Sequence, residues 1–266
     1  MSCRHVEILF DSPIARVANV VCDAPRSAPD APEFSAACKI VLPRRGVFAV
    51  HRRGDPVVAD GNSALVLGAD DEYRVSHPGD GGDECTVLAV APELLEEALG
   101  DHRARHGTLR ASTQLSTRVL TVVARRAVSA LAVEEAALLA LDAVAADLTG
   151  PATTRPARRY VHEACALLAA DPEAPWRLDA LARAVHCSPF HLARQFRAAT
   201  GETVSRYLLR LRLALAMERM AAGETSLARL AHDLGFAHHS HFSARFRAVF
   251  GATPSDVRKI VTAPPR

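Results

Sequence analysis

The spacing of apolar and polar positions along the chain changes near residue 91, from a strand-like to a helix-like pattern. Before that point, short β-rich apolar runs alternate with turns rich in proline and glycine, as expected of a small antiparallel barrel or sandwich. The runs are residues 39–42, 47–50, 64–67 and 85–90. After it, apolar residues recur at helical spacing. They predict helices over about residues 92–99, 113–131 and 134–148.

The last of these helices leads into a segment with the composition of a linker. Leu138, Leu139, Leu141 and Val144 form its predicted apolar face, which we expect to cover the sheet or to pair with a second subunit. The following sequence, TGPATTRP, combines a glycine, two prolines and three threonines. We therefore expect a first domain at residues 1–150, with strands up to about residue 91 and helices over 92–148. A linker at 151–157 and a second domain at 158–266 complete the chain.

The second domain carries one pattern twice. Residues 178–196 (LDALARAVHCSPFHLARQF) align with residues 227–246 (LARLAHDLGFAHHSHFSARF), and the second copy has one extra residue where the chain bends. Each copy predicts two short helices joined by a tight turn, with Ser188 as N-cap and Pro189 at the first helical position in the first copy. Such a pair with a polar outer face is typical of a helix-turn-helix, here at about residues 178–199 and 227–250.

A helix predicted over residues 204–221, capped by Thr203, joins the two copies. Its length of roughly 27 Å is close to the rise of about 34 Å in one turn of B-DNA. A connector of this length would hold two recognition helices in successive major grooves.

The two halves of the chain carry opposite charge, although the whole has a net charge of only +2. Residues 1–150 hold 15 Lys and Arg against 21 Asp and Glu, a net −6, and residues 151–266 hold 17 against 9, a net +8. The basic residues of the second half are all Arg except Lys259. The Arg guanidinium can form two hydrogen bonds at once to a phosphate or to a base edge. This half is therefore expected to bind a polyanion.

Three further motifs carry a resemblance to a known family. They are Tyr207-Leu208-x-Arg210-Leu211-Arg212, Leu234-Gly235-Phe236 and Phe250-Gly251-x-Thr253-Pro254-Ser255. With the duplicated unit, they make residues from about 158 to 258 resemble the DNA-binding domain of AraC/XylS-type transcription regulators. The resemblance implies a one-component regulator that binds specific DNA. The fold class it implies is α+β: an N-terminal cupin-like β-barrel with a helical hairpin, then an all-α domain with two helix-turn-helix units.

By position, the resemblance assigns DNA contacts to the outer face of each unit. Base contacts are expected from Phe190, His191, Arg194, His239, Ser240, His241 and Arg245. Phosphate contacts are expected from Ser188, Arg197, Arg206, Arg210, Arg212 and Arg247. Arg194 is the strongest candidate, because Arg to guanine is the commonest specific pairing. The family frequently has Arg where this chain has Ala244, so base reading by the second unit is in doubt.

The histidines and cysteines suggest no clear ligand set. His102 and His106 stand four apart in a basic run, and the sequence HHSH at 238–241 has no acidic or cysteine ligand beside it. Cys85 near His77 is compatible with a redox or electrophile sensor, but a buried strand cysteine is commonly a small hydrophobe. We expect no metal, no cofactor and no enzymatic step. The alternative from another class is a metal-dependent cupin-type enzyme with a helical appendage.

The remaining expectations concern location and partners. Six scattered cysteines without a Cys-x-x-Cys pair favour a reducing compartment. The first ten residues lack a signal-peptide core, and no apolar run approaches the ~20 residues of a membrane span. We therefore expect a cytoplasmic protein without a membrane partner. Its expected partners are double-stranded DNA, a small-molecule effector, RNA polymerase if it activates, and a second copy of the chain. A first domain that only dimerises, without a ligand, stays an alternative.

Overall fold

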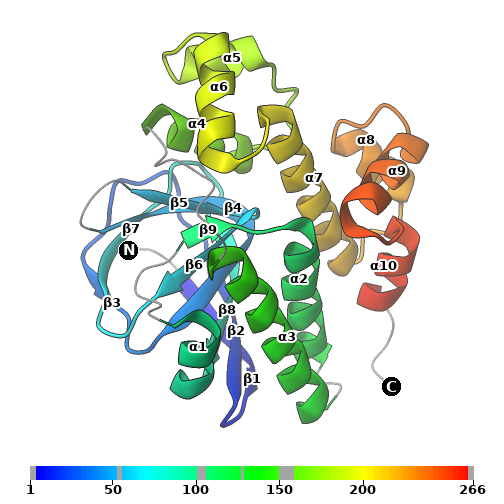
Figure 1. Cartoon of the computed structure of the whole chain (residues 1–266). Coiled ribbons are helices and arrows are strands. Elements are labelled where there is room, and N and C mark those ends of the chain that lie inside the picture. Colours follow the sequence, from blue (N-terminus) through cyan, green and yellow to red (C-terminus); the bar gives the residue numbers. More distant parts are fainter. Residues whose placement is uncertain (1–3, 53–55, 101–105, 127–128, 150–158, 263–266) are drawn as a thin grey trace.

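The computed structural model describes residues 4–52, 56–100, 106–126, 129–149 and 159–262. Within these ranges, a β-sheet with three helices forms the sheet domain (residues 4–149), and helices alone form the helical domain (residues 159–262; Figure 1). The strands are β1 (Arg4–Asp11), β2 (Ala15–Cys22), β3 (Glu33–Phe34), β4 (Lys39–His51), β5 (Val57–Asp60), β6 (Ser63–Leu67), β7 (Glu72–Ser76), β8 (Asp83–Val90) and β9 (His106–Thr108). The linker predicted at 151–157 lies outside the described residues.

Most helices follow the sequence prediction, but residues 130 and 131 begin the next helix, and residues 106–108, within the part predicted as helical, form β9. In the sheet domain they are α1 (Pro92–Leu99), α2 (Ala111–Arg126) and α3 (Ala130–Thr149). In the helical domain they are α4 (Arg159–Ala170), α5 (Leu178–Ala184), α6 (Pro189–Thr200), α7 (Val204–Ala221), α8 (Leu227–Asp233), α9 (His239–Phe250) and α10 (Pro254–Thr262). None of these described helices combines the length and the apolar character that a membrane crossing requires.

The sheet is antiparallel, with the strand order β1-β2-β8-β4-β6-β9. Off this path, β5 and β7 pair with β4, and β3 pairs with β7. The path ends at β1 and β9, and in the described part of the chain these two strands do not pair with each other. The antiparallel strands expected from the sequence are confirmed, whereas the closure of a cupin-like barrel is not.

β4 corrects one detail of the sequence prediction. Residues 39–42 and 47–50 were expected as separate strands, but both belong to this single strand. The strand runs through Pro43 because its register against β8 shifts between Pro43 and Arg45, and such a bulge accommodates a residue without an amide hydrogen. Gly46 follows with a φ of 72°, where a Cβ would lie 2.1 Å from the Gly82 oxygen. The proline and the glycine therefore mark a bulge and a close approach, and the chain does not turn there.

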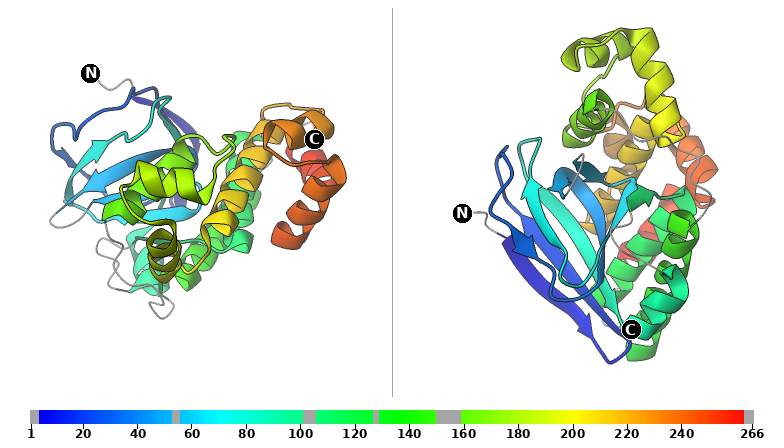
Figure 2. Two further views of the ribbon diagram at one scale, coloured as in Figure 1. Left: turned by 90° about the horizontal axis from the view of Figure 1, so that it is seen from above. Right: turned by 60° about the vertical axis from the view of Figure 1, so that its left-hand side comes forward.

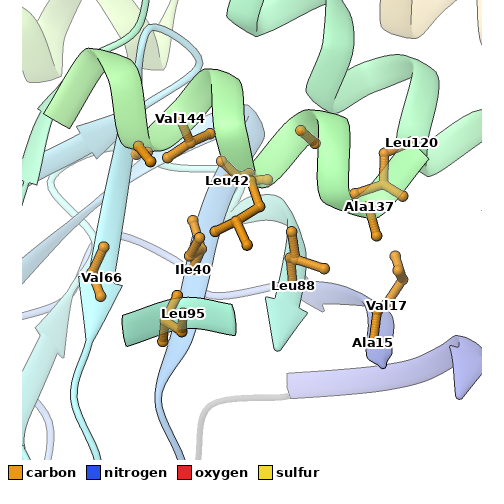
Figure 3. Packing of buried hydrophobic residues seen from close by; sticks show 14 of the residues in the cluster. Ala15, Val17, Ile40, Leu42, Val66, Leu88, Leu95, Leu120, Ala137 and Val144 are labelled. Carbon is orange, nitrogen blue, oxygen red and sulfur yellow. The ribbon is translucent and has the colours of Figure 1, made fainter. Parts of the chain in front are cut away.

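One face of the sheet packs against α1, α2 and α3 to form the main core (Figure 3). Sheet residues Ile40 and Leu88 share this core with Ala137 and Val144 of α3. The predicted apolar face of α3 is partly wrong. Leu141 and Val144 are buried, but Leu139 is 62% exposed and Leu138 is 37% exposed. The contact runs instead through a stripe of small side chains, which brings α3 close to the sheet.

In the helical domain, α7 is shared between two small cores. Its first half packs with α4, α5 and α6 through Tyr207, Leu208 and Leu211. Its second half packs with α8, α9 and α10 through Leu213 and Met217, among others. The sheet domain lies against the helical domain (Figure 2), since α4 and α7 contact β4 while α2 contacts α7 and α9. It therefore touches α9 directly and reaches the first of the two cores through α4 and α7.

Candidate nucleic-acid interface

The first helix-turn-helix unit consists of α5 and α6, joined by residues 185–188. Ser188 caps α6 as predicted, because its hydroxyl accepts a hydrogen bond from the His191 amide at 3.2 Å. Gly201 ends the helix in the left-handed conformation with a φ of 77°. Leu192 and Phe196 are fully buried in the unit's core. These caps and core contacts fix which face of α6 points outwards.

The outward face of α6 carries the residues expected to contact bases. Phe190 is 79% exposed, and Arg194 and Arg197 are exposed as well. Neither arginine forms an ion pair within the described residues. His191 is half-buried, and its Nε2 lies 2.8 Å from the Tyr160 hydroxyl of α4. Tyr160 is a positioning residue that the sequence analysis missed; its only signal is an aromatic side chain at the start of α4.

The second unit consists of α8 and α9, joined by residues 234–238. This connection has five residues against four in the first unit, which confirms the extra residue predicted at the bend. Four phenylalanine rings form its core, with centroid separations of 5.3, 5.7 and 4.8 Å along the series Phe236, Phe242, Phe246 and Phe250. Gly251 ends α9 with a φ of 74°, in the same way as Gly201 ends α6.

The outward face of α9 is rich in histidine. His239, Ser240, His241, Arg245 and Arg247 are all exposed. His241 accepts a hydrogen bond from the Arg245 Nε at 3.2 Å, so these two side chains are already joined. Ala244 is exposed at the position where the first unit has Arg194.

The helix α7 departs from the prediction at two arginines. Thr203 caps it as expected, and Arg206 is exposed at its start. Arg210, however, is only 4% exposed and donates to Glu202 at 2.9 Å and to the Leu109 carbonyl. Arg212 donates to the carbonyls of Pro172 and Ala174 at 2.7 and 2.8 Å. Both guanidinium groups bind the protein itself in this structure, so the phosphate contacts predicted for Arg210 and Arg212 stay predictions that this arrangement does not favour.

Comparison with known proteins agrees with this geometry. A family model described as a helix-turn-helix domain matches residues 181–260. The regulatory protein SoxS of Salmonella typhimurium is 36% identical over 84 residues, which are 32% of this chain and 78% of SoxS. The chain belongs to the AraC family of transcription regulators.

Other relatives are similar to part of the chain. A putative AraC-like transcription regulator of Streptomyces lividans is 36% identical over 94 residues, which are 35% of this chain and 31% of that protein. An AraC-type transcriptional regulator of known structure from Chromobacterium violaceum is 31% identical, covering 40% of this chain and 94% of that one, with a TM-score of 0.38. The chain spans only about a third of the length of this Streptomyces relative.

In this AraC-family chain, the sheet domain contacts α7 through buried polar groups. Glu218 of α7 accepts from Arg44 of β4 at 2.6 Å and lies 3.2 Å from the Nε of Arg118 in α2. Burial lowers the pKa of Arg118, and the Glu218 carboxylate opposes that shift. The arginines of this ion pair are almost fully buried, so their loss of hydration offsets much of the attraction. The ion pair therefore fixes the orientation of α7 against the sheet domain more than it adds to stability.

A second polar contact lies near the start of α7. The Tyr207 hydroxyl donates to the Asp60 carboxylate, and the Asn62 side chain donates to the Tyr207 carbonyl at 3.2 Å. Burial raises the pKa of Asp60, while the hydrogen bond from Tyr207 opposes that rise. These contacts could not be predicted from the sequence, because each joins residues more than a hundred positions apart.

The sheet domain also borders the space between the two units. Residues 106–111 line a cleft whose other walls include Arg206 of α7 and His241 and Arg245 of α9. The domain therefore lies beside residues that are expected to contact DNA.

Proposed function

We propose that this chain is a one-component transcription regulator in which the sheet domain sets how the two helix-turn-helix units are presented to DNA. The observation that carries the proposal is the convergence of the sheet-domain contacts on α7, the one helix that packs in the cores of both units. A small change in the sheet domain would reach both units through this helix. Such coupling between sites is typically worth a 5- to 150-fold change in affinity.

The proposed DNA contacts follow from exposure and position. Base contacts are assigned to Phe190, His191, Arg194, His239, Ser240, His241 and Arg245. Phosphate contacts are assigned to Ser188, Arg197, Arg206 and Arg247. Recognition helices about one turn of DNA apart would favour an asymmetric site of two half-sites.

The first experiment identifies the DNA. Genomic fragments retained by the purified full-length chain are sequenced, and they should share one motif with two half-sites. The affinity for such a fragment should fall steeply as salt rises, because each neutralised phosphate releases counterions. Retained fragments without a shared motif, or an affinity that is flat with salt, would overturn the proposal.

A second experiment tests the route through α7. Glu218→Gln removes the charge that faces Arg44 and Arg118, and it should change the dissociation constant for the selected fragment by about 5-fold or more. Glu224→Gln is the matched control, because Glu224 pairs with Arg219 inside the helical domain. Equal affinities for both variants and the parent chain would show that the sheet domain does not influence the units.

We propose that the sheet domain takes a small anionic effector with an apolar body. A cavity of about 340 Å³ on its second face is lined largely by apolar side chains, together with Arg4, Arg16 and Lys39. Arg4 and Arg16 pair with Glu33 and Asp11, whereas Lys39 forms no salt bridge within the described ranges. Burial lowers the pKa of Lys39, and an anion bound beside the ammonium in this cavity would oppose that shift.

A thermal-shift screen of the full chain with alkyl and aryl carboxylates tests this assignment. A compound that raises the melting temperature should lose its effect in Lys39→Gln and keep it in Arg26→Gln, a change outside the cavity. The same compound should alter the affinity for the selected DNA. If no compound acts, the reading that the first domain only dimerises is favoured.

We also propose that a second copy of the chain packs on α3. Leu131, Leu138 and Leu139 are 74%, 37% and 62% exposed, at positions seven and eight residues apart on one helix face. Light scattering of the full chain should show a dimer, and Leu139→Glu should convert it to a monomer. A dimer that survives this change would place the interface elsewhere.

A further inference from the structure

Three side chains that commonly bind metals meet in the cavity of the sheet domain. Cys22, His77 and Asp83 each offer one ligand atom, and these atoms all lie within 4.8 Å of one another. Their exposures are 3%, 1% and 7%, so all three are buried. They line the same 340 Å³ cavity whose other walls are largely apolar.

The sheet itself places two of these residues together. Cys22 is the last residue of β2 and Asp83 the first of β8, and the two are direct partners in the antiparallel register. Directly paired residues point to the same face of a sheet, so the thiol and the carboxylate share the cavity side. Gly82 permits the approach, because a Cβ there would lie 1.7 Å from the Cys22 carbonyl oxygen and its φ is 68°.

His77 is held in place by a separate contact. It follows β7 and forms an isolated bridge with Ser27, whose amide donates to the His77 carbonyl at 3.0 Å. The His77 Nε2 lies 2.9 Å from Asp83 Oδ1, and its Nδ1 lies 3.4 Å from the Ser27 hydroxyl. The ring thus aims one nitrogen at the cluster and the other at an orienting hydroxyl. Metal-binding histidines typically have such a partner on the second nitrogen.

We propose that Cys22, His77 and Asp83 form a binding site for a divalent transition metal of the zinc class, with a fourth position facing the cavity. A thiolate, an imidazole and a carboxylate are all zinc ligands, and three protein ligands leave one tetrahedral position for another molecule. Calcium and magnesium prefer oxygen ligands alone, so this set does not suit them. The thiol loses its proton on binding, and the proton is released to solvent.

Cys85 lies just outside this set. Its Sγ donates to Asp83 Oδ2 at 3.1 Å, on the carboxylate oxygen that does not face His77. It therefore acts as an orienting partner of a ligand. The sequence analysis considered Cys85 with His77 and expected no metal. It missed Cys22, which is 61 positions from Asp83 in the sequence and becomes its neighbour only through strand pairing.

The test uses the full chain, stripped with a chelator and then titrated with cobalt(II) as the probe. A ligand set with one thiolate should give a sulfur-to-cobalt charge-transfer band that saturates near one metal per chain and is displaced by zinc. Cys22→Ser should abolish the band, and Asp83→Asn should weaken binding at least about 100-fold. Ser27→Ala removes the hydroxyl that contacts the His77 ring and also accepts from the His77 amide at 3.3 Å, and it should cost about 10- to 100-fold. Circular dichroism of each variant checks that it is folded.

Two controls separate this site from other ligands on the chain. The double variant His239→Ala/His241→Ala removes exposed histidines that could bind metal at the surface, and Cys187→Ser removes a cysteine of the helical domain; both should keep the band. A band that survives Cys22→Ser, or binding lost with the surface histidines, would overturn the proposal. So would a folded parent chain that binds no cobalt, since the cluster would then be a hydrogen-bonded structural group. None of these three results bears on the selection of DNA fragments, so the proposed function is tested separately.

Discussion

The two helix-turn-helix units share a backbone plan but distribute their polar contacts differently. In the first unit the recognition helix α6 is capped by Ser188, while α5 has no side-chain cap. In the second unit the cap is on the supporting helix, where Ser226 accepts from the Arg229 amide, and α9 has none. The outer faces differ as well: α6 carries the exposed Arg194, and α9 carries Ala244 at the matching position.

This difference indicates that the duplicated units do different work. The first holds its recognition helix by a cap and by the contact between Tyr160 and His191, and its exposed Arg194 forms no ion pair within the described residues. The second holds its helix by edge-to-face phenylalanine rings and exposes histidines and the hydrogen-bonded pair of His241 and Arg245. We expect the first unit to contribute most of the base specificity. The second unit should contribute more of the affinity that does not depend on sequence.

The largest expected effect is on the free energy of unfolding and concerns the cores of the two units. Phe246→Ala should lower the free energy of unfolding by about 3–5 kcal/mol, because it removes a fully buried ring. Phe196→Ala removes an equally buried ring that has a single aromatic neighbour, Tyr207, whereas Phe246 has two. Each aromatic pair adds about 0.5–1.5 kcal/mol, so Phe246→Ala should cost more.

Chemical denaturation of the full chain measures both losses. Phe190→Ala is the control, since this ring is 79% exposed and its removal should change stability by less than about 0.5 kcal/mol. Equal losses of unfolding free energy for Phe196→Ala and Phe246→Ala would show that the additional aromatic neighbour of Phe246 does not distinguish the units.

The cores of these units were accessible from the sequence because their contacts are local. Apolar residues three and four apart, a serine before a proline, and a glycine at the end define α6 without reference to the rest of the chain. The strands β1 and β2 were not predicted, because Arg16 and Asn19 interrupt the apolar run of β2. Asn19 is nevertheless buried, since its side chain accepts from Arg44. Its partner lies 25 positions away, so the sequence does not show it.

The next effect concerns base reading. Arg194→Ala should reduce discrimination at one base position by about 1–3 kcal/mol while leaving the rest of the motif intact. Ala244→Arg places the same side chain on the second unit and should create a new preference at one position of the other half-site. Binding measured against a library of single-base variants shows both changes.

The control for the new arginine is Ala244→Lys, which adds a similar charge without the planar fork. It should strengthen binding to all sequences alike. If Arg194→Ala weakens every sequence equally, Arg194 contacts only phosphate, and the first unit loses its assigned role.

A smaller effect concerns the caps. Ser188→Ala should destabilise the chain by about 1 kcal/mol, because the His191 amide loses its acceptor. His238→Ala at the matching position of α9 should have almost no effect, since that side chain makes no cap hydrogen bond. His238→Ser should stabilise the second unit by a similar amount if it adopts the geometry of Ser188. Thermal unfolding of the three variants tests the order.

The phosphate contacts show where sequence reasoning reached its limit. Arg206 and Arg210 are four positions apart on α7 and look alike in the sequence, yet one is exposed and the other is buried. Only the position of the Leu109 carbonyl, which comes from the sheet domain, separates them. The same holds for Arg212, whose partners are carbonyls about forty positions earlier.

The smallest expected effect is on the salt dependence of DNA binding, and it follows from this difference between exposed and buried arginines. Arg197→Gln removes an exposed charge and should reduce the slope of log affinity against log salt by about 1, uniformly across sequences. Arg210→Gln should leave the slope unchanged, because its guanidinium already binds Glu202 and Leu109. It should lower stability instead, since Glu202 then loses a partner. If both variants reduce the slope equally, Arg210 must leave its buried position when DNA binds. The sheet domain would then have to release α7 before the regulator could bind its DNA site.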